Sequence, residues 1–246
     1  MSLRDKVLMY LPNWAEAFSI VKDQVWGYEK LGLSKFGLRN QLEPGICLRL
    51  KDVLESQGSE VYLNVKGVAA PIFDTDIDVL EFRDGKAIAY EVKGLRVKRR
   101  GRGKEKVLSG PGALEGAEQA LNHLLNAGFS VDYAYLVHPA LMFRGYILRT
   151  AIILDRLTPL GYIVITPIGE LVELVKPRPN PLKGTQKLAD IPRNAILGVD
   201  PRHLEKMLEK EIERDTGIPI DFSIGEVVKI HDILKNFGEY IKKRVI

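Results

Sequence analysis

Three short runs rich in β-branched and aromatic residues lie in the first half of the chain, at 60–65, 77–83 and 86–92, and they predict β-strands. Asp84-Gly85 joins the second and third runs. Because both residues tolerate positive φ, we expect a tight hairpin there. The two faces of this hairpin are both mostly apolar, so it is expected to be a covered, central part of a sheet.

Apolar positions spaced three and four residues apart predict helices around these strands. The first 42 residues have this spacing, with a break at Pro12, and Glu43-Pro44-Gly45 opens a shorter helix, Ile46 to Glu55, that Gly58 ends. After the hairpin, the pattern predicts a helix at 112–127 and a strand at 131–138. A second hairpin at 161–175 and an extended proline-rich segment at 177–181 follow, and then two helices at 202–215 and 224–243.

This order predicts an α/β fold with a mixed central sheet flanked by helices. We divide the chain into a helical N-terminal extension at 1–42, a core at 43–180 and a mostly helical C-terminal region at 181–246. A chain of 246 residues is long enough to bury a substantial core.

Charge is concentrated in one segment of the chain. Seven Lys and Arg residues between Gly94 and Gly110, against Glu105 alone, give this segment a net charge of +6, whereas the other 229 residues carry −2. Glycines within the segment predict a mobile loop. Because clustered cations bind polyanions, the segment is a candidate nucleic-acid contact, and the alternative is a solvated charge run.

The remaining composition bears on the location and on the classes of site. Cys47 is the single cysteine, which excludes an internal disulfide, a zinc site built on several thiolates and an iron–sulfur cluster. We found no apolar run long enough to span a bilayer and no signal peptide at the N-terminus, so we expect a soluble, cytoplasmic protein without a membrane partner. Five glutamines beside abundant Lys, Arg and Glu favour a heat-adapted (thermophile) source.

The predicted hairpin places two carboxylates opposite each other. With a two-residue turn, residues whose numbers sum to 169 are paired, so Asp78 faces Glu91 and Asp76 faces Lys93. Directly opposed residues have Cβ atoms about 4.5–5.5 Å apart, where two negative charges repel each other. The pair is therefore expected to need a proton or a cation.

Two cations are candidates for this position. Lys93 offers one countercharge, and a salt-bridged surface cluster is the simpler interpretation. A divalent metal offers more charge, because hard cations such as Mg²⁺ or Mn²⁺ select carboxylate and carbonyl oxygens. The coherent hairpin and the basic segment directly after Lys93 favour the metal site.

Several features follow one another in a fixed order along this part of the chain. They are an acid at the start of a helix, Asp78 on a strand, a tight hairpin, the strand Glu91-Val92-Lys93 and a following helix with Gln119. In these features the stretch from Glu43 to His138 resembles the PD-(D/E)xK, or restriction-endonuclease-like, nuclease superfamily, in its Holliday-junction-resolvase-like and RecB-like branches. The resemblance covers roughly 95 residues. The proline that often leads the motif is absent, since Ile77 precedes Asp78.

The resemblance implies roles for the inner residues of this motif. Asp78 and Glu91 would bind the metal, the Val92 carbonyl would be a further ligand, and Lys93 would orient the attacking water or stabilise the charged phosphate. Glu43 would be the acid of the first helix, although a helix N-cap carboxylate beside Pro44 explains it equally well.

Gln119 would be the catalytic glutamine of the RecB-like branch, and His123 stands where that branch usually has tyrosine. A surface glutamine is the alternative. Gln119 falls opposite Leu114, Leu121 and Leu125, the side of the helix that we expect to face the core.

We therefore expect a Mg²⁺- or Mn²⁺-dependent endonuclease that hydrolyses phosphodiester bonds in DNA, as a repair or restriction enzyme does. The basic loop lacks aromatic residues, so contact with the DNA backbone is favoured over base stacking. Its expected DNA-binding residues are Arg96, Lys98, Arg99, Arg100, Arg102, Lys104 and Lys106. The alternatives are a catalytically silent nucleic-acid-binding module and an RNA-directed nuclease. Related enzymes are often dimers, so a homodimer is also open.

Overall fold

The structure is a computed structural model that describes residues 35–66, 76–100, 105–125, 131–142, 144–183 and 196–219. The helical stretches predicted before residue 35 and at 224–243 lie outside the described residues, as do Arg102 and Lys104. Within the described part of the chain, none of the helices combines the length and the hydropathy needed to cross a lipid bilayer.

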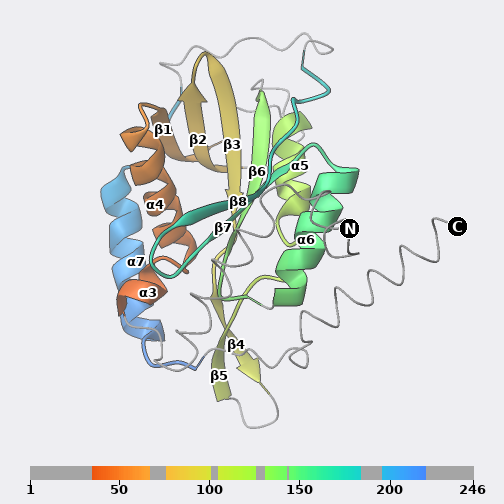
Figure 1. Cartoon of the computed structure of the whole chain (residues 1–246). Coiled ribbons are helices and arrows are strands. Elements are labelled where there is room, and N and C mark those ends of the chain that lie inside the picture. The colour runs from red at the N-terminus through yellow and green to blue at the C-terminus, as the bar shows by residue number, and fades with distance from the viewer. Residues whose placement is uncertain are drawn as a thin grey trace, which may run out of the picture.

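Six strands form a mixed sheet in the order β1-β2-β3-β6-β7-β8 (Figure 1). β1, β2 and β3 are antiparallel neighbours, β6 runs parallel to both β3 and β7, and β8 is antiparallel to β7. The bounds are Glu60–Val65 for β1, Ile77–Arg83 for β2, Lys86–Val92 for β3, Tyr133–Pro139 for β6, Gly161–Ile165 for β7 and Leu171–Val175 for β8.

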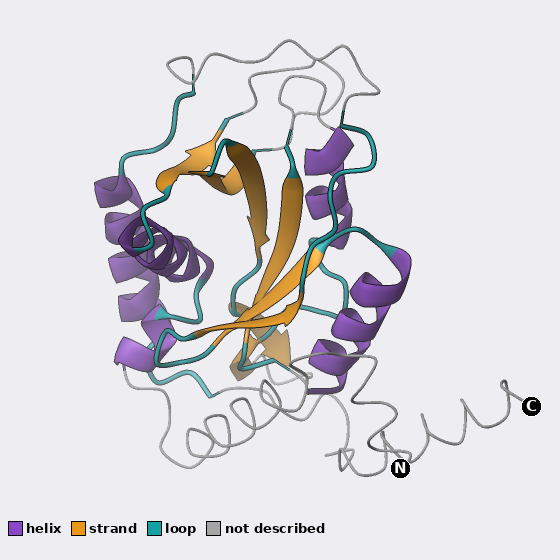
Figure 2. Ribbon diagram, turned by 45° about the horizontal axis from the view of Figure 1, so that its top comes forward, coloured by secondary structure: helices purple, strands orange, loops and turns teal. Residues whose placement is uncertain are grey.

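Helices flank this sheet on both sides (Figure 2). α4 packs on β1 and β2, α5 packs on β6 and β3, and α6 packs on β7 and β8. α7 lies beside α4 and α3, and Arg39 of α3 forms a 2.5 Å ion pair with Glu205 of α7. The bounds are Lys35–Arg39 for α3, Glu43–Ser56 for α4, Ala117–Leu125 for α5, Arg144–Leu157 for α6 and Pro201–Asp215 for α7. The predicted α/β class is thus confirmed.

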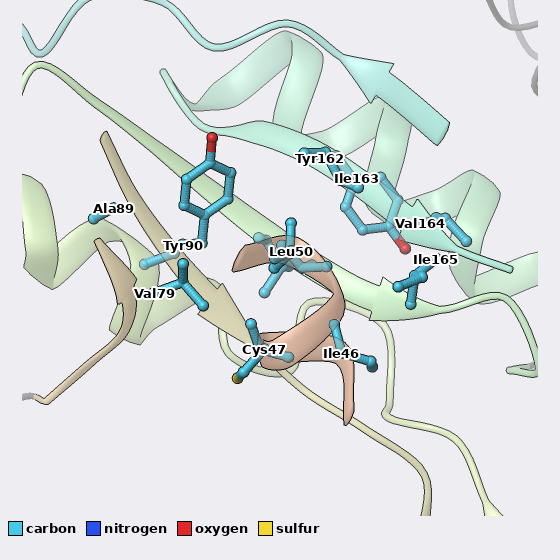
Figure 3. Close-up of a cluster of buried hydrophobic side chains, with 14 of the residues drawn as sticks. Ile46, Cys47, Leu50, Val79, Ala89, Tyr90, Tyr162, Ile163, Val164 and Ile165 are labelled. Carbon is cyan, nitrogen blue, oxygen red and sulfur yellow. The ribbon is translucent and has the colours of Figure 1, made fainter. Parts of the chain in front are cut away.

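The core between α4 and the sheet contains large apolar side chains from several elements. Figure 3 shows Cys47 and Leu50 of α4 beside Val79 of β2 and Tyr90 of β3. All four are buried, and so is most of β7. Burial of this face fixes how α4 sits on the sheet, and therefore where the first residue of α4 lies.

The β2–β3 hairpin has the predicted register. Val79 pairs with Tyr90 and Arg83 pairs with Lys86, which is the expected sum of 169. The turn residues Asp84 and Gly85 have φ values of 51° and 73°, as a tight hairpin turn requires.

The basic segment and the start of the helix after it differ from the sequence-based expectation. The basic segment is not a loop: β4 (Arg96–Arg100) and β5 (Glu105–Ser109) form a separate antiparallel two-stranded ribbon, which extends away from the main sheet in Figure 1. The helix predicted from Gly112 begins only at Ala117, because Leu114 and Gly116 have positive φ and turn the chain before the helix starts.

α6 was not predicted. Its buried residues do have helical spacing, since Ile147, Thr150, Ala151 and Leu154 face inward. The partly buried pair Ile152-Ile153 on the neighbouring positions hides this pattern, because it makes the segment apolar on more than one side.

Candidate active site

Four charged residues from three elements converge at one end of the β2–β3 hairpin. Glu43 is the first residue of α4 and Asp78 is the second residue of β2. Glu91 is the last but one residue of β3, and Lys93 directly follows this strand. The charges of Glu91 and Lys93 both influence the pKa values of Glu43 and Asp78. The structure therefore brings together residues that are up to 50 positions apart in the sequence.

Asp78 and Glu91 lie next to each other just beyond the last paired residues of the hairpin, Val79 and Tyr90. Asp78 Oδ2 accepts a 2.7 Å hydrogen bond from the backbone N–H of Val92. Burial and the nearby charge of Glu91 raise the pKa of Asp78 to about 8. Two carboxylates with little access to water therefore share a site that lacks sufficient positive charge.

Glu91 is only 2% exposed, and both of its oxygen atoms have partners. Lys93 Nζ donates to Oε1 at 2.5 Å, and Nε2 of His123 lies 2.9 Å from Oε2. The Lys93 side chain is 19% exposed, so its ammonium group lies between the buried acids and solvent. The contacts with Glu91 and the charges of Asp78 and Glu43 favour the charged ammonium, and together they raise the pKa of Lys93 despite its partial burial.

Glu43 is fixed against the chain that leaves β3. Its carboxylate accepts a hydrogen bond from the backbone N–H of Gly94, and burial raises its pKa. A Cβ atom on Gly94 would lie 2.2 Å from the backbone nitrogen of Glu43, so only glycine permits this approach. Leu95 N–H also donates to the carbonyl of Gln41 at 2.7 Å. These contacts hold the start of α4 beside Lys93.

The residues before α5 cover the aliphatic part of Lys93. Gly116 has a φ of 85°, and a Cβ atom there would lie 3.0 Å from Cγ of Lys93. The carbonyl of Glu115, in the same turn, is 2.9 Å from Nε2 of buried His138. Burial lowers the pKa of His138 to about 4, so this histidine is neutral near pH 7 and stabilises the turn.

The buried face of α5 is different from the one predicted. Ala117, Ala120, His123 and Leu124 face the sheet, whereas Leu125 is 38% exposed. Two alanines let the helix approach β3 and β6 closely, and this outweighs the burial of the larger leucines. Gln119 is exposed, and the side chain of α5 that reaches the acids is His123.

His123 was not among the predicted site residues. Its side chain is 0% exposed. Its position in the sequence carried a signal for this role. His123 is three positions after Ala120 and directly before Leu124, and residues spaced in this way share one helix face, so His123 faces the sheet if Ala120 does. That signal is visible only once the alanines are assigned to the core.

The cations of the β4–β5 ribbon lie directly after the site in the chain. Lys98, Arg99 and Lys106 are exposed, and Arg96 is exposed but forms a 2.5 Å ion pair with Glu115. The strand Glu91-Val92-Lys93 is thus followed within three residues by a strand of the ribbon.

The oxygen donors at this site suit a hard divalent cation. Asp78 Oδ1 and Glu91 Oε1 are the carboxylate oxygens available to it if Lys93 moves, and Val92, directly after Glu91 at the end of β3, offers its carbonyl oxygen. As the side chains stand, no three His, Cys, Asp or Glu residues in the described ranges form a ready cluster for a metal ion. The raised pKa of Asp78 indicates that the site would gain from more positive charge.

A second buried acid, Glu81, offers a useful contrast. It lies on the opposite face of β2, where Ser59 Oγ donates to one of its oxygens at 2.6 Å and Tyr90 OH donates to the other at 2.5 Å. The guanidinium of Arg83 also lies 3.4 Å from Oε1 of Glu81, so two hydroxyl groups and one cation satisfy this carboxylate. Glu81 is therefore a structural acid, unlike the pair of Asp78 and Glu91.

The chain matches no protein-family model, no curated protein and no solved structure in the comparisons made.

Proposed function

We propose that this protein is a metal-dependent nuclease of the PD-(D/E)xK type that hydrolyses phosphodiester bonds in DNA. The observation that carries the proposal is the convergence of Asp78, Glu91 and Lys93 at the end of one hairpin, with two poorly solvated carboxylates beside each other. The sequence resemblance supports the same assignment and adds Glu43, which lies within electrostatic range of the other three.

In this proposal Asp78 and Glu91 hold Mg²⁺ or Mn²⁺, with the Val92 carbonyl as a further ligand. The bound cation supplies Lewis-acid chemistry, since it lowers the pKa of water and neutralises charge on a phosphate. Lys93 then has a separate role: its ammonium group, which Glu91 holds in the metal-free chain, stabilises the negative charge that develops on the phosphate oxygens.

Glu43 has a supporting role in this scheme. Its carboxylate faces Lys93 from the start of α4 and stays there through the hydrogen bond from Gly94. This contact limits where the Lys93 ammonium can go when it leaves Glu91. Gln119 is a weaker candidate for a role in catalysis, because its side chain is exposed on α5.

The ribbon supplies the affinity for DNA in this proposal. Lys98, Arg99 and Lys106 are exposed on a ribbon that continues from the strand carrying Glu91. Such cations neutralise phosphates and give affinity that depends on salt but not on sequence. Arg96, Arg100, Arg102 and Lys104 belong to the same basic segment and complete the proposed DNA-binding set. We place this enzyme in the cytoplasm, because its single, buried cysteine suits a reducing compartment.

A cleavage panel tests the proposal. The full chain is incubated with linear duplex DNA, single-stranded DNA, branched DNA and RNA, each with Mg²⁺, Mn²⁺ or EDTA. We expect metal-dependent cleavage of at least one DNA substrate, and Asp78→Asn is expected to abolish it while Asp52→Asn, at an exposed position of α4, leaves it intact. Binding without cleavage would favour the silent module, and cleavage of RNA alone would favour the RNA-directed nuclease.

A further inference from the structure

We propose that His123 is a positioning residue for Glu91: it holds Oε2 of this carboxylate, so that Oε1 is the oxygen that binds the metal ion. The inference rests on the proposed function, because it concerns how the same site binds its cation. It assigns to α5 a role that neither the sequence pattern nor the resemblance gave to His123.

The geometry separates the two oxygens of Glu91 clearly. Oε2 lies 2.9 Å from Nε2 of His123, whose side chain is completely buried. Oε1 lies 2.5 Å from Nζ of Lys93, whose side chain still reaches solvent. One partner is therefore fixed by packing, and the other is a cation on a flexible chain that can leave. Only Oε1 can exchange its partner without disturbing the core.

The direction of this hydrogen bond follows from the chemistry of the two groups. An ionised carboxylate only accepts, so Nε2 of the imidazole carries the hydrogen and donates it to Oε2. A carboxylate held in this way cannot rotate to present both oxygens to a cation. Glu91 would then bind the metal through one oxygen, in a direction set by the ring of His123.

The other ring nitrogen shows that His123 serves Glu91 rather than packing alone. Nδ1 is buried and has no hydrogen-bond partner among the described residues. An unpaired buried polar atom is unfavourable, and an apolar side chain such as leucine would fill the same space beside Ala120 and Leu124 without that cost. Among the described contacts, the one with Glu91 therefore explains why a histidine occupies this position.

Three substitutions separate hydrogen-bond donation from packing. His123→Gln keeps an N–H donor at about the reach of Nε2, His123→Asn has a donor that falls short of Glu91, and His123→Leu has none. The measurement is Mn²⁺ affinity of the full chain in the absence of DNA, by titration near neutral pH, with the melting temperature of each metal-free variant as a check on folding.

We expect His123→Leu and His123→Asn to weaken Mn²⁺ binding by about 10- to 100-fold, the usual effect of losing a residue that orients a ligand. His123→Gln should bind Mn²⁺ nearly as tightly as the wild type. If His123→Leu does not fold, the comparison of His123→Gln with His123→Asn decides the question in the same way.

Equal Mn²⁺ affinity in the wild type and the Leu or Asn variants would overturn the inference, and so would a Gln variant as weak as Asn. Both results leave the proposed function standing, because the wild type still binds the metal. A wild-type chain that binds no Mn²⁺ would instead overturn the proposed function, and the inference with it.

Discussion

Lys93 Nζ lies 2.5 Å from Oε1 of Glu91, so the ammonium group occupies the oxygen that we assign to the metal ion. The two residues are on the same side of the chain because they are two positions apart at the end of an extended strand. This relationship makes Lys93 a competitor of the cation in the metal-free chain and frees it to act on the phosphate when the cation binds.

The first prediction follows from this competition. Lys93→Met should bind Mg²⁺ more tightly than the wild type, because methionine brings no positive charge to Glu91, while cleavage should fall by about 10²–10³-fold. The affinity is measured by titration at about pH 9, above the pKa of Asp78, so that protons compete little. Lys86→Met, at the exposed opposite end of β3, is the matched control and should change neither quantity. Weaker Mg²⁺ binding by Lys93→Met would argue against competition between the Lys93 ammonium group and the metal ion for Glu91.

The second prediction concerns stability of the metal-free chain against pH. The pKa of Asp78 is raised from 3.8 to about 8, so the folded state holds this proton more tightly than the unfolded state. The resulting stabilisation is complete below about pH 4 and is lost as the pH rises to 8. Between pH 6.5 and 8, the unfolding free energy should therefore fall with pH, by up to about 1.4 kcal/mol per unit.

The lower limit of this window comes from His138. Its pKa is lowered from 6.5 to about 4, so below pH 6.5 the unfolded state takes up a proton there and the opposite slope is added. Denaturant titrations at several pH values should show the fall in the wild type and a nearly flat line in Asp78→Asn. Mg²⁺ should remove most of the fall. The same slope in both proteins would show that Asp78 is not the titrating group.

The third prediction concerns the ribbon. Replacing Lys98, Arg99 and Lys106 by alanine should reduce the slope of log affinity for DNA against log salt by up to about 3, because each neutralised phosphate contributes about 0.9. The matched control replaces Arg202, Lys206 and Lys210, two lysines and one arginine that are exposed on α7. We expect the control to keep the wild-type slope. Equal slopes for both triple variants would remove the ribbon from the interface.

The fourth prediction concerns the approach of the chain after β3 to the start of α4. Gly94→Ala should lower the unfolding free energy by about 1–3 kcal/mol or more, because the added methyl would overlap the backbone of Glu43. Activity should fall as Glu43 and Lys93 are displaced. Gly112→Ala, where a Cβ atom meets only Glu115 at 3.7 Å, is the control for which little change is expected. Thermal or denaturant unfolding of both variants provides the measurement.

The hairpin could be predicted because the residues that determine its geometry are close together in the sequence. The turn at Asp84-Gly85 sets the register, and the register places Asp78 beside Glu91 without knowledge of any other element. The strand bounds of β1, β2 and β3 were predicted to the residue for the same reason. Local pattern was sufficient wherever a single turn or a single run determined the geometry.

The missing parts depend on contacts between distant segments. His123 reaches Glu91 only because Ala117 and Ala120 face the sheet, and a helical wheel that favours large leucines places the wrong side inward. The basic segment was expected to be a mobile loop because of its glycines. Pairing of Val97 with Leu108 and of Lys98 with Val107 gives it strand structure instead, and both Val107 and Leu108 are buried.

The most direct test of the central claim is the Mg²⁺-dependent cleavage rate of Glu91→Gln on the DNA substrate that the wild type cuts best. Glu209→Gln, at an exposed position of α7, serves as the matched control. We predict that the wild type and Glu209→Gln cleave at equal rates in Mg²⁺ and not in EDTA, and that Glu91→Gln has no measurable metal-dependent activity. Cleavage by Glu91→Gln at the wild-type rate would contradict the assignment of the site.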